Sequence, residues 1–447
     1  MKMLYILNNF PKISETFVIN QIAGLIDNGI DIKILARNNP NEITVHNIFY
    51  DYKLEGKVHY LITNESRLGF ELNDLNIESL IDSDIVHAHF ATWAADIAHN
   101  ISKILNIPYV VTVHARDLYM NTEIDKLKRN LNDANKIITI SEYNKKYIQR
   151  MLGEISEDKI SVIRCGIKTN EFKRDINWHK GESRLRILSV GRLIEKKGIH
   201  LAVQAFVKIC RKYENVEYVI IGDGPKKDEI LNIISDNGME DRISFCGVKS
   251  QIDVINEMRK ADIYILPSII ASDGDREGLP VSILEAQAMQ IPVISTRHTG
   301  IPEAVIDGVT GFLLTENDIE AIAEKMEVLI SDERLRKKMG QQGRRIVEQY
   351  FKQEDEIKNL IKIINEIKRF DVSTLTERDK FLLLFKEGIN QKDYLLEKLE
   401  KKTGTLERNL KEKDHKINEL EAYTEKIKKT VFYKLYRRFV GTIKNLN

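Results

Sequence analysis

The sequence predicts an α/β protein with two largely parallel sheets, each covered by helices. Short apolar, β-branched stretches alternate with amphipathic stretches of helical length over most of the chain. This alternation is interrupted at Lys168–Arg184, where charge is scattered and no apolar period is visible. From about Asp371 glycine and proline nearly vanish and charge of both signs rises. We therefore expect two sheet domains joined by a linker, followed by a charged helical extension.

The two sheet domains are placed at residues 1–168 and 184–349, and residues 350–370 form one further helix. Strands of the first domain are expected at Leu4–Leu7, Asp31–Leu35, Ile85–His89, Tyr109–His114, Lys136–Ile140 and Ile160–Arg164. Strands of the second are expected at Arg186–Val190, Glu217–Ile221, Ile243–Cys246, Ile263–Pro267 and Pro292–Ser295.

Composition narrows the class of protein. The 447 residues are 43% hydrophobic and 30% charged, and the formal net charge of +1 gives no whole-chain basis for binding nucleic acid. The cysteines Cys165, Cys210 and Cys246 are far apart, which argues against a zinc site or a disulfide framework and suits a reducing compartment. We expect no signal peptide and no membrane-spanning segment, and a cytoplasmic location.

The extension at residues 371–447 has two features of its own. Its leucines, from Leu396 to Leu420, follow an interrupted heptad, which favours a self-associating coiled coil over a long solvated helix or a partly disordered tail. Lys426–Asn447 is basic with an aromatic face, which suits an anionic membrane surface at the inner face of the cytoplasmic membrane. Packing of that face against a partner protomer is an equal alternative.

The most informative stretch begins at a buried strand, Ala261–Pro267. A charged loop, Ser272–Gly278, leads from it to a helix that we expect at Val281–Met289, with a proline at the first helical position. Free amides at a helix N-terminus favour an anion. Glu277 and Glu285 flank this helix start, so both carboxylates can face a ligand at the carboxyl ends of the strands.

This stretch resembles the retaining nucleotide-sugar glycosyltransferases of family 4, which have the two-domain GT-B fold. The resemblance rests on Glu277-Gly278-Leu279-Pro280 through Glu285, followed by Gly300-Ile301-Pro302-Glu303 and Gly308-Val309-Thr310-Gly311-Phe312. It implies that Glu277 holds a donor-sugar hydroxyl and acts in catalysis, and that Glu285 accepts hydrogen bonds from the ribose. The backbone of Gly278, Leu279, Pro280 and Val281 would contact the diphosphate and sugar. In this family the helix at residues 350–370 crosses back to the first domain.

A second stretch, Leu188–Gly198, supplies positive charge. A buried strand ends at Gly191, where a small residue lets backbone approach a phosphate, and Arg192 and Lys197 follow in the loop. By the same resemblance Arg192 and Lys197 bind the donor diphosphate and assist its departure. Pairing of Arg192 with a surface acid is the alternative, and Lys196 is interpreted as a solvated neighbour. Phe245-Cys246-Gly247 resembles the segment against the nucleobase, which makes Gly247 a donor-side residue.

In the first domain His114 ends a buried strand, and so is expected at the cleft between the domains. There it would donate to a sugar hydroxyl or to developing negative charge, although a core histidine satisfied by backbone is the alternative. The family usually shows His-Gly-x-Asp, whereas Ala115 replaces that glycine here and Asp117 keeps its place. Arg116 and Asp117 are acceptor-side candidates, and His89 is expected to line the acceptor cleft.

The loop Asn8–Phe17 lacks the two glycines that many relatives place there. Its Pro-Lys-x-Ser-Glu-Thr-Phe string resembles the subgroup that acts in bacterial exopolysaccharide assembly, of the colanic acid and amylovoran type. Ser14 and Thr16 either cap the following helix or contact the sugars.

The resemblance implies a transferase that uses no metal and no cofactor besides its nucleotide-sugar donor. Two Asp-x-Asp strings, Asp82-Ser83-Asp84 and Asp273-Gly274-Asp275, are also typical of metal-dependent glycosyltransferases. The first string comes before its strand and not after it. The second lies in the loop before Glu277, whose following residues match the family that uses no metal. We expect transfer of a sugar to a lipid-linked glycan acceptor, by front-face substitution with retention. A nucleotide-sugar epimerase of the same fold and an inactive scaffold organised by the extension are the alternatives.

Overall fold

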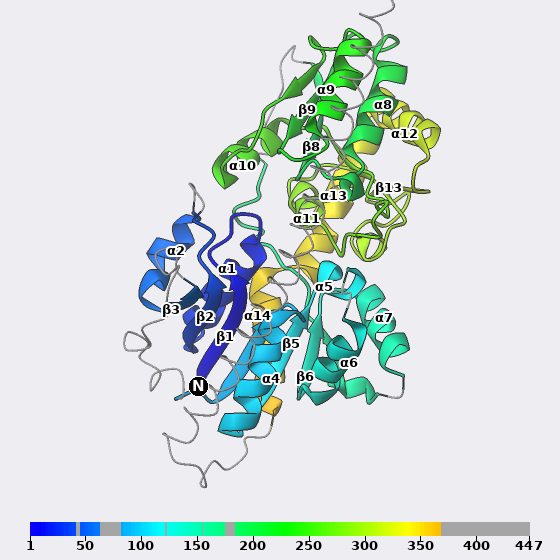
Figure 1. Ribbon diagram of the computed structural model, residues 1–447. Helices are drawn as coiled ribbons and strands as arrows, with labels where there is room; N and C mark the ends of the chain where they lie inside the picture. The colour runs from blue at the N-terminus through cyan, green and yellow to red at the C-terminus, as the bar shows by residue number, and fades with distance from the viewer. Residues whose placement is uncertain (42–44, 63–81, 121–122, 154, 175–183, 368–447) are drawn as a thin grey trace, which may run out of the picture. The chain divides into compact units, whose positions relative to one another are not determined.

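The computed structural model describes residues 1–41, 45–62, 82–120, 123–153, 155–174 and 184–367 (Figure 1). The chain divides into two units, Met1–Thr374 and Leu375–Asn447, and all described residues belong to the first. The coiled coil and the basic segment expected at residues 371–447 lie outside the described residues.

The first sheet has seven parallel strands in the order β3-β2-β1-β4-β5-β6-β7. Its strands are β1 (Lys2–Asn9), β2 (Asp31–Asn38), β3 (Val58–Ile62), β4 (Ile85–His89), β5 (Tyr109–Val113), β6 (Lys136–Thr139) and β7 (Ile160–Val162). The helices between them are α1 (Thr16–Asp27), α2 (Asn47–Asp51), α4 (Trp93–Leu105), α5 (Ala115–Tyr119), α6 (Ile124–Asp133) and α7 (Glu142–Leu152). All residues of β4 and β5 are buried, as expected for strands covered on both faces.

The second sheet has six parallel strands in the order β10-β9-β8-β11-β12-β13. Its strands are β8 (Leu185–Val190), β9 (Val216–Ile221), β10 (Ile243–Phe245), β11 (Ile263–Leu266), β12 (Val293–Thr296) and β13 (Gly311–Leu314). The helices are α8 (Ile199–Cys210), α9 (Lys227–Asp236), α10 (Gln251–Lys260), α11 (Val281–Ala288), α12 (Ile319–Ser331) and α13 (Glu333–Tyr350).

Both sheets change direction of winding in the middle, and this decides where a ligand can bind. The order reverses between β1 and β4 in the first sheet and between β8 and β11 in the second. Loops that leave neighbouring strands at such a point diverge to opposite faces, and the crevice between them is the usual ligand site of an open α/β sheet. The predicted pair of sheet domains is confirmed.

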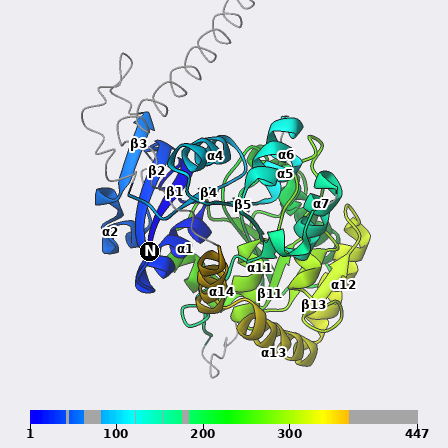
Figure 2. The same cartoon turned by 90° about the horizontal axis from the view of Figure 1, so that it is seen from below.

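The helix after the second sheet returns to the first core. The buried side chains Ile357, Leu360 and Ile364 of α14 (Gln353–Glu366) belong to the same apolar cluster as Ile22 of α1 (Figure 2). A Cβ atom on Gly24 would lie 2.8 Å from Cγ1 of Ile357, so the close approach of α1 and α14 depends on this glycine.

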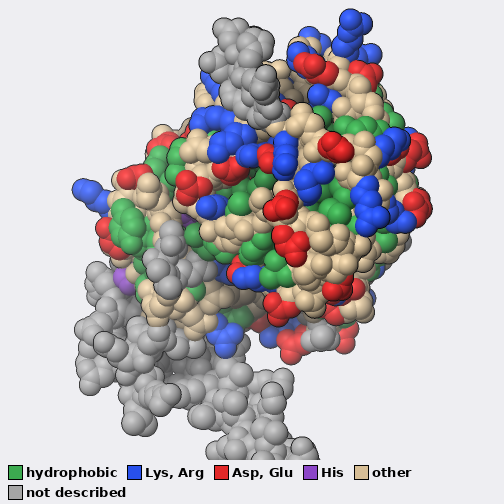
Figure 3. All heavy atoms as spheres, turned by 90° about the horizontal axis from the view of Figure 1, so that it is seen from above, with side chains coloured by type: hydrophobic (Ala, Val, Ile, Leu, Met, Phe, Trp, Pro, Cys, Tyr) green, Lys and Arg blue, Asp and Glu red, His purple; other side chains and the backbone are tan. Residues whose placement is uncertain are grey.

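Two edge strands and one helix start differ from the predictions. Neither β3 nor β13 was predicted, and each lies at the end of its sheet. Pro280 is the N-cap of α11 with a ψ of 120°, and not its first helical residue, because helical geometry begins only at Val281. Among the described helices, none combines the length and apolarity needed to cross a bilayer. Basic and acidic side chains intermingle on the face seen in Figure 3.

Candidate active site

Two loops at the switch point of the second sheet meet through an ion pair. Lys197 lies in the 3₁₀ turn Glu195–Lys197 that follows β8, and Glu277 lies in the loop that follows β11. The Lys197 Nζ atom is 3.0 Å from Oε2 of Glu277, and both side chains are largely buried. The methylenes of Lys197 pass 3.6 Å from the place that a Cβ atom on Gly191 would take, which is an ordinary van der Waals distance.

Lys196 completes the charge cluster, contrary to its interpretation as a solvated neighbour. It is buried, and its Nζ atom is 3.0 Å from Oδ1 of Asp275 and 3.4 Å from Oε1 of Glu277. It also donates to the carbonyl oxygen of Arg276 at 3.0 Å. The sequence could not reveal this, because the tight 3₁₀ turn directs neighbouring lysines to the same buried carboxylate.

The cluster fixes the charge state of Glu277. Burial alone would raise its pKa, but the attraction of Lys197 and then of Lys196 outweighs burial and lowers the pKa of Glu277 to about 2. Glu277 is therefore ionised at neutral pH and serves as a hydrogen-bond acceptor. Arg192, by contrast, is exposed and forms no ion pair with any other described residue, which leaves its charge available to an anion.

The backbone of the Glu277 loop is held by the loop after the neighbouring strand β12. The Glu277 N–H donates to Nε2 of His298 at 3.0 Å. The Thr299 hydroxyl donates to the carbonyl oxygens of Glu277 and Gly278, at 2.7 and 2.9 Å, and the Gly300 N–H donates to that of Gly278 at 3.1 Å. The sequence analysis missed His298 and Thr299, although their place just after a buried strand at the same sheet edge was a usable signal.

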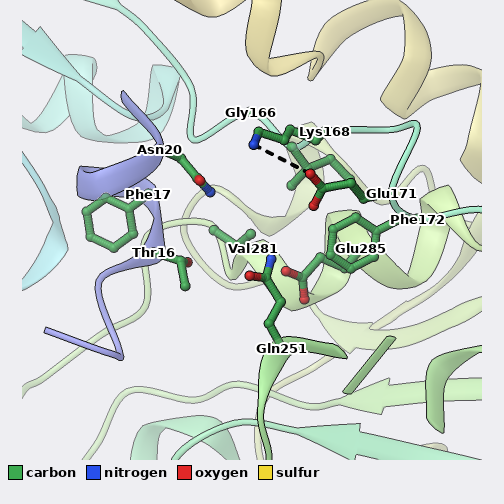
Figure 4. A pocket seen from close by; sticks show the side chains of 11 residues that line it. Thr16, Phe17, Asn20, Gly166, Lys168, Glu171, Phe172, Gln251, Val281 and Glu285 are labelled. Atoms are coloured by element: carbon green, nitrogen blue, oxygen red, sulfur yellow. Dashed lines mark ion pairs between the residues drawn. The ribbon is translucent and has the colours of Figure 1, made fainter. Parts of the chain in front are cut away.

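Glu285 extends into a cavity between α1 and the second sheet domain (Figure 4). The cavity is bordered by Thr16 and Asn20 on one side and by Gln251 and Glu285 on the other. Burial raises the pKa of Glu285 to about 7, and no other described residue is hydrogen-bonded to its carboxylate. A half-buried carboxylate without a partner is suited to accept hydrogen bonds from a ligand.

The structure excludes one of the two roles considered for the hydroxyls in the loop before α1. The N-cap residue of α1 is Glu15, without a side-chain cap, so the alternative that Ser14 or Thr16 caps this helix was wrong. The backbone N–H of Glu15 instead bonds to the Lys12 carbonyl in a turn, and the helix begins at Thr16. Thr16 borders the cavity that contains Glu285, whereas Ser14 is exposed.

Three buried histidines lie at the carboxyl edge of the first sheet. Nε2 of His89 is 2.8 Å from Nε2 of His114, and Nε2 of His87 is 2.7 Å from the Thr112 hydroxyl. Burial lowers the pKa of His114 to about 3, so its ring is neutral at ordinary pH. Phe17 packs on the His114 ring with centroids 4.7 Å apart.

The contact between the two Nε2 atoms constrains where the hydrogens are. One ring must donate and the other accept, and Nδ1 of the buried His89 has no hydrogen-bond partner in the described structure. The His114 side chain also accepts from the backbone N–H of Asp117, in the capping box at the start of α5. Nδ1 is therefore the unprotonated nitrogen of His114, and the hydrogen on its Nε2 is donated to His89.

Asp117 has backbone partners for both carboxylate oxygens. Its Oδ1 accepts from the N–H of His114 at 2.8 Å and its Oδ2 from the N–H of Ala91 at 2.7 Å. Burial raises the pKa of Asp117 to about 7 against the opposing effect of these bonds. Asp117 thus joins the loop after β4 to the start of α5 and fixes the backbone of His114. The neighbouring side chain of Arg116 is exposed.

Glu303 and Gly278 connect the second sheet domain to the first. Glu303 accepts from the N–H of Tyr143 at 3.1 Å and from Nη2 of Arg164 at 3.0 Å. A Cβ atom on Gly278 would lie 2.5 Å from Cδ1 of Ile140, so either the Glu277 loop or the end of that side chain would have to shift. The same Cβ atom would lie 3.7 Å from that of Ala115, which places the Glu277 loop beside the start of α5.

The remaining predicted positions have simple surroundings. Leu279 and Pro280 are buried, Val281 borders the cavity of Glu285, and Gly247 has a φ of +65° directly after β10. Of the Asp-x-Asp strings, Asp84 accepts from the N–H of Lys2, and Asp275 is paired with Lys196. In the described part of the chain, no group of three or more His, Cys, Asp or Glu side chains is arranged to hold a metal ion.

Family models match both sheet domains. A model described as Glycosyltransferase Family 4 matches residues 14–171, and one described as Glycosyl transferases group 1 matches residues 170–346. The chain is 29% identical over 367 residues to the amylovoran biosynthesis glycosyltransferase AmsK of Erwinia amylovora, covering 72% of this chain and 89% of the relative. It is 30% identical over 370 residues to the putative colanic acid biosynthesis glycosyltransferase WcaL of Salmonella typhimurium, covering 73% and 90%.

Solved structures share the fold. Anabaena Alr3699/HepE in complex with UDP superposes with a TM-score of 0.66 at 19% identity, over 82% of this chain and 100% of the other. A glycosyltransferase from Rickettsia africae gives a TM-score of 0.65 at 22% identity, over 82% and 98%.

Proposed function

Since the chain belongs to the group 1 and family 4 glycosyltransferases, we propose that it transfers a sugar, with retention, from a nucleotide-sugar donor to a glycan acceptor in bacterial surface polysaccharide synthesis. The polysaccharide assignment follows the names of AmsK and WcaL. A lipid-linked glycan would be met at the inner face of the cytoplasmic membrane, to which the basic residues of Lys426–Asn447 would attach the enzyme.

The buried contact between Lys197 and Glu277 is the observation that carries this proposal. It places a fixed carboxylate and a cation at the switch point of the second sheet, where open α/β sheets bind ligands. In our proposal Glu277 accepts hydrogen bonds from the donor sugar, and Lys197 and Arg192 meet the charge of the diphosphate. The N-terminus of α11 adds amides and a favourable dipole.

The proposed reaction needs no divalent ion and no covalent intermediate. The acceptor hydroxyl oxygen bonds to the anomeric carbon on the face from which the diphosphate departs, and its proton passes to the departing phosphate oxygen. Arg192 and Lys197 stabilise the negative charge that develops on that phosphate. Glu277 is a weak nucleophile here, because its pairing with two lysines lowers the basicity of the carboxylate. His114, whose ring is neutral and held by His89 and the backbone N–H of Asp117, lies on the acceptor side of the site.

A transfer assay tests the proposal. The full chain is incubated with UDP- and GDP-sugars, a polyprenyl-diphosphate-linked glycan and EDTA, and products are read by mass spectrometry. We expect one nucleotide sugar to support transfer, and Lys197→Ala to lower turnover about 100-fold. Lys208→Ala is the matched control, since Lys208 is exposed on α8 and paired with Glu320. Equal turnover in both variants would contradict the site, and a free epimerised nucleotide sugar formed without acceptor would contradict the reaction.

A further inference from the structure

His298 lies between two acidic residues, and the proposed reaction gives it no role. Its side chain is 1% exposed. Nε2 accepts a hydrogen bond from the backbone N–H of Glu277 at 3.0 Å, and Nδ1 is 2.7 Å from Oε1 of Glu316. A backbone N–H can only donate, so Nε2 must be the unprotonated nitrogen. The hydrogen of the neutral ring is therefore on Nδ1 and is donated to Glu316.

Glu316 is itself held in place. Its second oxygen accepts from the backbone N–H of Ile270 at 2.8 Å. The resulting chain runs from Ile270, in the loop after β11, through Glu316 after β13, to His298 after β12 and back to Glu277. Each polar group in this chain has a partner, and the chain is buried at His298 and reaches the surface at Ile270.

We propose that His298 is a positioning residue for donor binding, which in its neutral Nδ1–H form holds the Glu277 backbone in the place that the donor sugar needs. This inference rests on the proposed function, because it assigns Glu277 to the donor. The neighbouring residues Thr299 and Gly300 hold carbonyl oxygens of the same loop, whereas His298 holds its N–H. Loss of that one bond would free the peptide between Arg276 and Glu277 and shift the carboxylate.

Protonation of His298 would break the arrangement. A second hydrogen on Nε2 would face the Glu277 N–H, so two donors would meet. Burial lowers the pKa of His298, opposed by Glu316 and Glu277 and assisted by Arg276, so the ring stays neutral at neutral pH. The other nearby cations are compensated, since Lys196 and Lys197 pair with Glu277 and Arg297 pairs with Asp307. Donor affinity should therefore fall only in acid.

The test compares two substitutions of His298. His298→Gln keeps an acceptor near the position of Nε2 and cannot carry a proton, whereas His298→Leu removes both hydrogen bonds. His59→Gln, on the edge strand β3, is the matched control. Binding of UDP-glucose and GDP-mannose is measured by calorimetry from about pH 8 to about pH 5, the range in which histidine titrates. The donor that the unmodified protein binds more tightly is then used for the KM of donor and acceptor.

We expect His298→Leu to weaken donor binding about tenfold while the acceptor KM is unchanged, and His298→Gln to stay within about threefold. The fall of donor affinity in acid should be smaller in His298→Gln than in His59→Gln, and the part that remains in His298→Gln belongs to Glu285, whose pKa is raised to about 7 by burial. The inference is overturned if His298→Leu binds donor like the unmodified protein, if donor and acceptor KM change alike, or if the acid dependence of His298→Gln equals that of His59→Gln. Glu277→Gln separates the two proposals: if it too leaves donor binding unchanged, the proposed function fails, and if it alone weakens binding, only the role of His298 fails.

Discussion

The Nζ atom of Lys197 lies 3.0 Å from Oε2 of Glu277, and this contact joins the loop after β8 to the loop after β11. The two strands are neighbours in the sheet, although about 75 residues separate them in the chain. The second oxygen of Glu277 faces Lys196. The carboxylate is therefore paired with two cations, which hold it in one orientation. This geometry, rather than any single side chain, is what a donor sugar and its diphosphate would meet.

Glu277→Gln should destabilise the protein as well as lower its activity. It leaves two buried lysines with less compensation, which we expect to lower the free energy of unfolding by about 3 kcal/mol. The folded pKa of Glu277 is depressed to about 2, so its stabilisation is present above the unfolded pKa of about 4.3 and is lost as the pH falls towards 2. Urea unfolding from about pH 7 to about pH 3 measures this.

The control for that experiment is Glu320→Gln, whose carboxylate is exposed and pairs with Lys208 on the surface. Unfolding curves of Glu277→Gln and Glu320→Gln that coincide at neutral pH would show that the buried cluster does not contribute as described.

Glu285→Gln should have the opposite effect on stability. Burial raises the pKa of Glu285 to about 7, so the protein loses stability as the pH rises from the unfolded pKa of about 4.3 through 7. Since part of the side chain is exposed to the cavity, we expect the variant to be more stable by about 1 kcal/mol at pH 8 and unchanged at about pH 4. Its donor affinity should fall, because glutamine offers a weaker acceptor to ribose hydroxyls. If Glu285→Gln were more stable than the unmodified protein at both pH 8 and about pH 4, the raised pKa of Glu285 would be contradicted.

Gly278→Ala should lower turnover about tenfold, because the new Cβ atom would meet Cδ1 of Ile140 at 2.5 Å and push the Glu277 loop from the first sheet. Ile140→Val removes that methyl group, so the double variant should recover most of the activity. Steady-state kinetics of the two single variants and the double variant measure this. A double variant as slow as Gly278→Ala would mean that contact with Ile140 is not the reason for glycine.

Glu303→Ala should loosen the contact between the two sheet domains. Glu303 accepts from Arg164 and from the N–H of Tyr143, and both bonds cross between the domains. We expect a larger radius of gyration by small-angle scattering, with Glu303→Gln intermediate because its carbonyl can still accept from Tyr143. Glu324→Ala, exposed on α12, is the control. Scattering curves of Glu303→Ala that match the control would contradict the role of Glu303.

The comparison of sequence and structure explains which features could be predicted. Buried strands such as Tyr109–Val113 were located because strands covered on both faces are apolar throughout. The edge strand Val58–Ile62 was not, since its residues 58–61 are only half-buried, whereas Ile85–His89, of the same length, is buried throughout. At the site, Glu277 and Glu285 flank a helix start, which predicted one ligand for both carboxylates at the carboxyl ends of the strands, and the family resemblance added Lys197.

The direction of side chains in turns could not be predicted. The burial of Lys196 depends on a 3₁₀ turn, and the use of Nε2 by His298 depends on how two loops lie against each other. Neither follows from local periodicity. The cap of α1 was mistaken for the same reason, since Ser14, Glu15 and Thr16 are adjacent and only the backbone torsions decide which is the N-cap.

Titration calorimetry of UDP and GDP against the full chain in EDTA tests the diphosphate site most directly. We expect one of the two nucleotides to bind the unmodified protein, the Lys197→Met variant to bind it at least about tenfold more weakly, and Lys208→Met to bind it normally. Equal affinity of all three proteins, or binding that appears only when a divalent ion is added, would contradict a diphosphate site built from Arg192, Lys197 and the amides of α11.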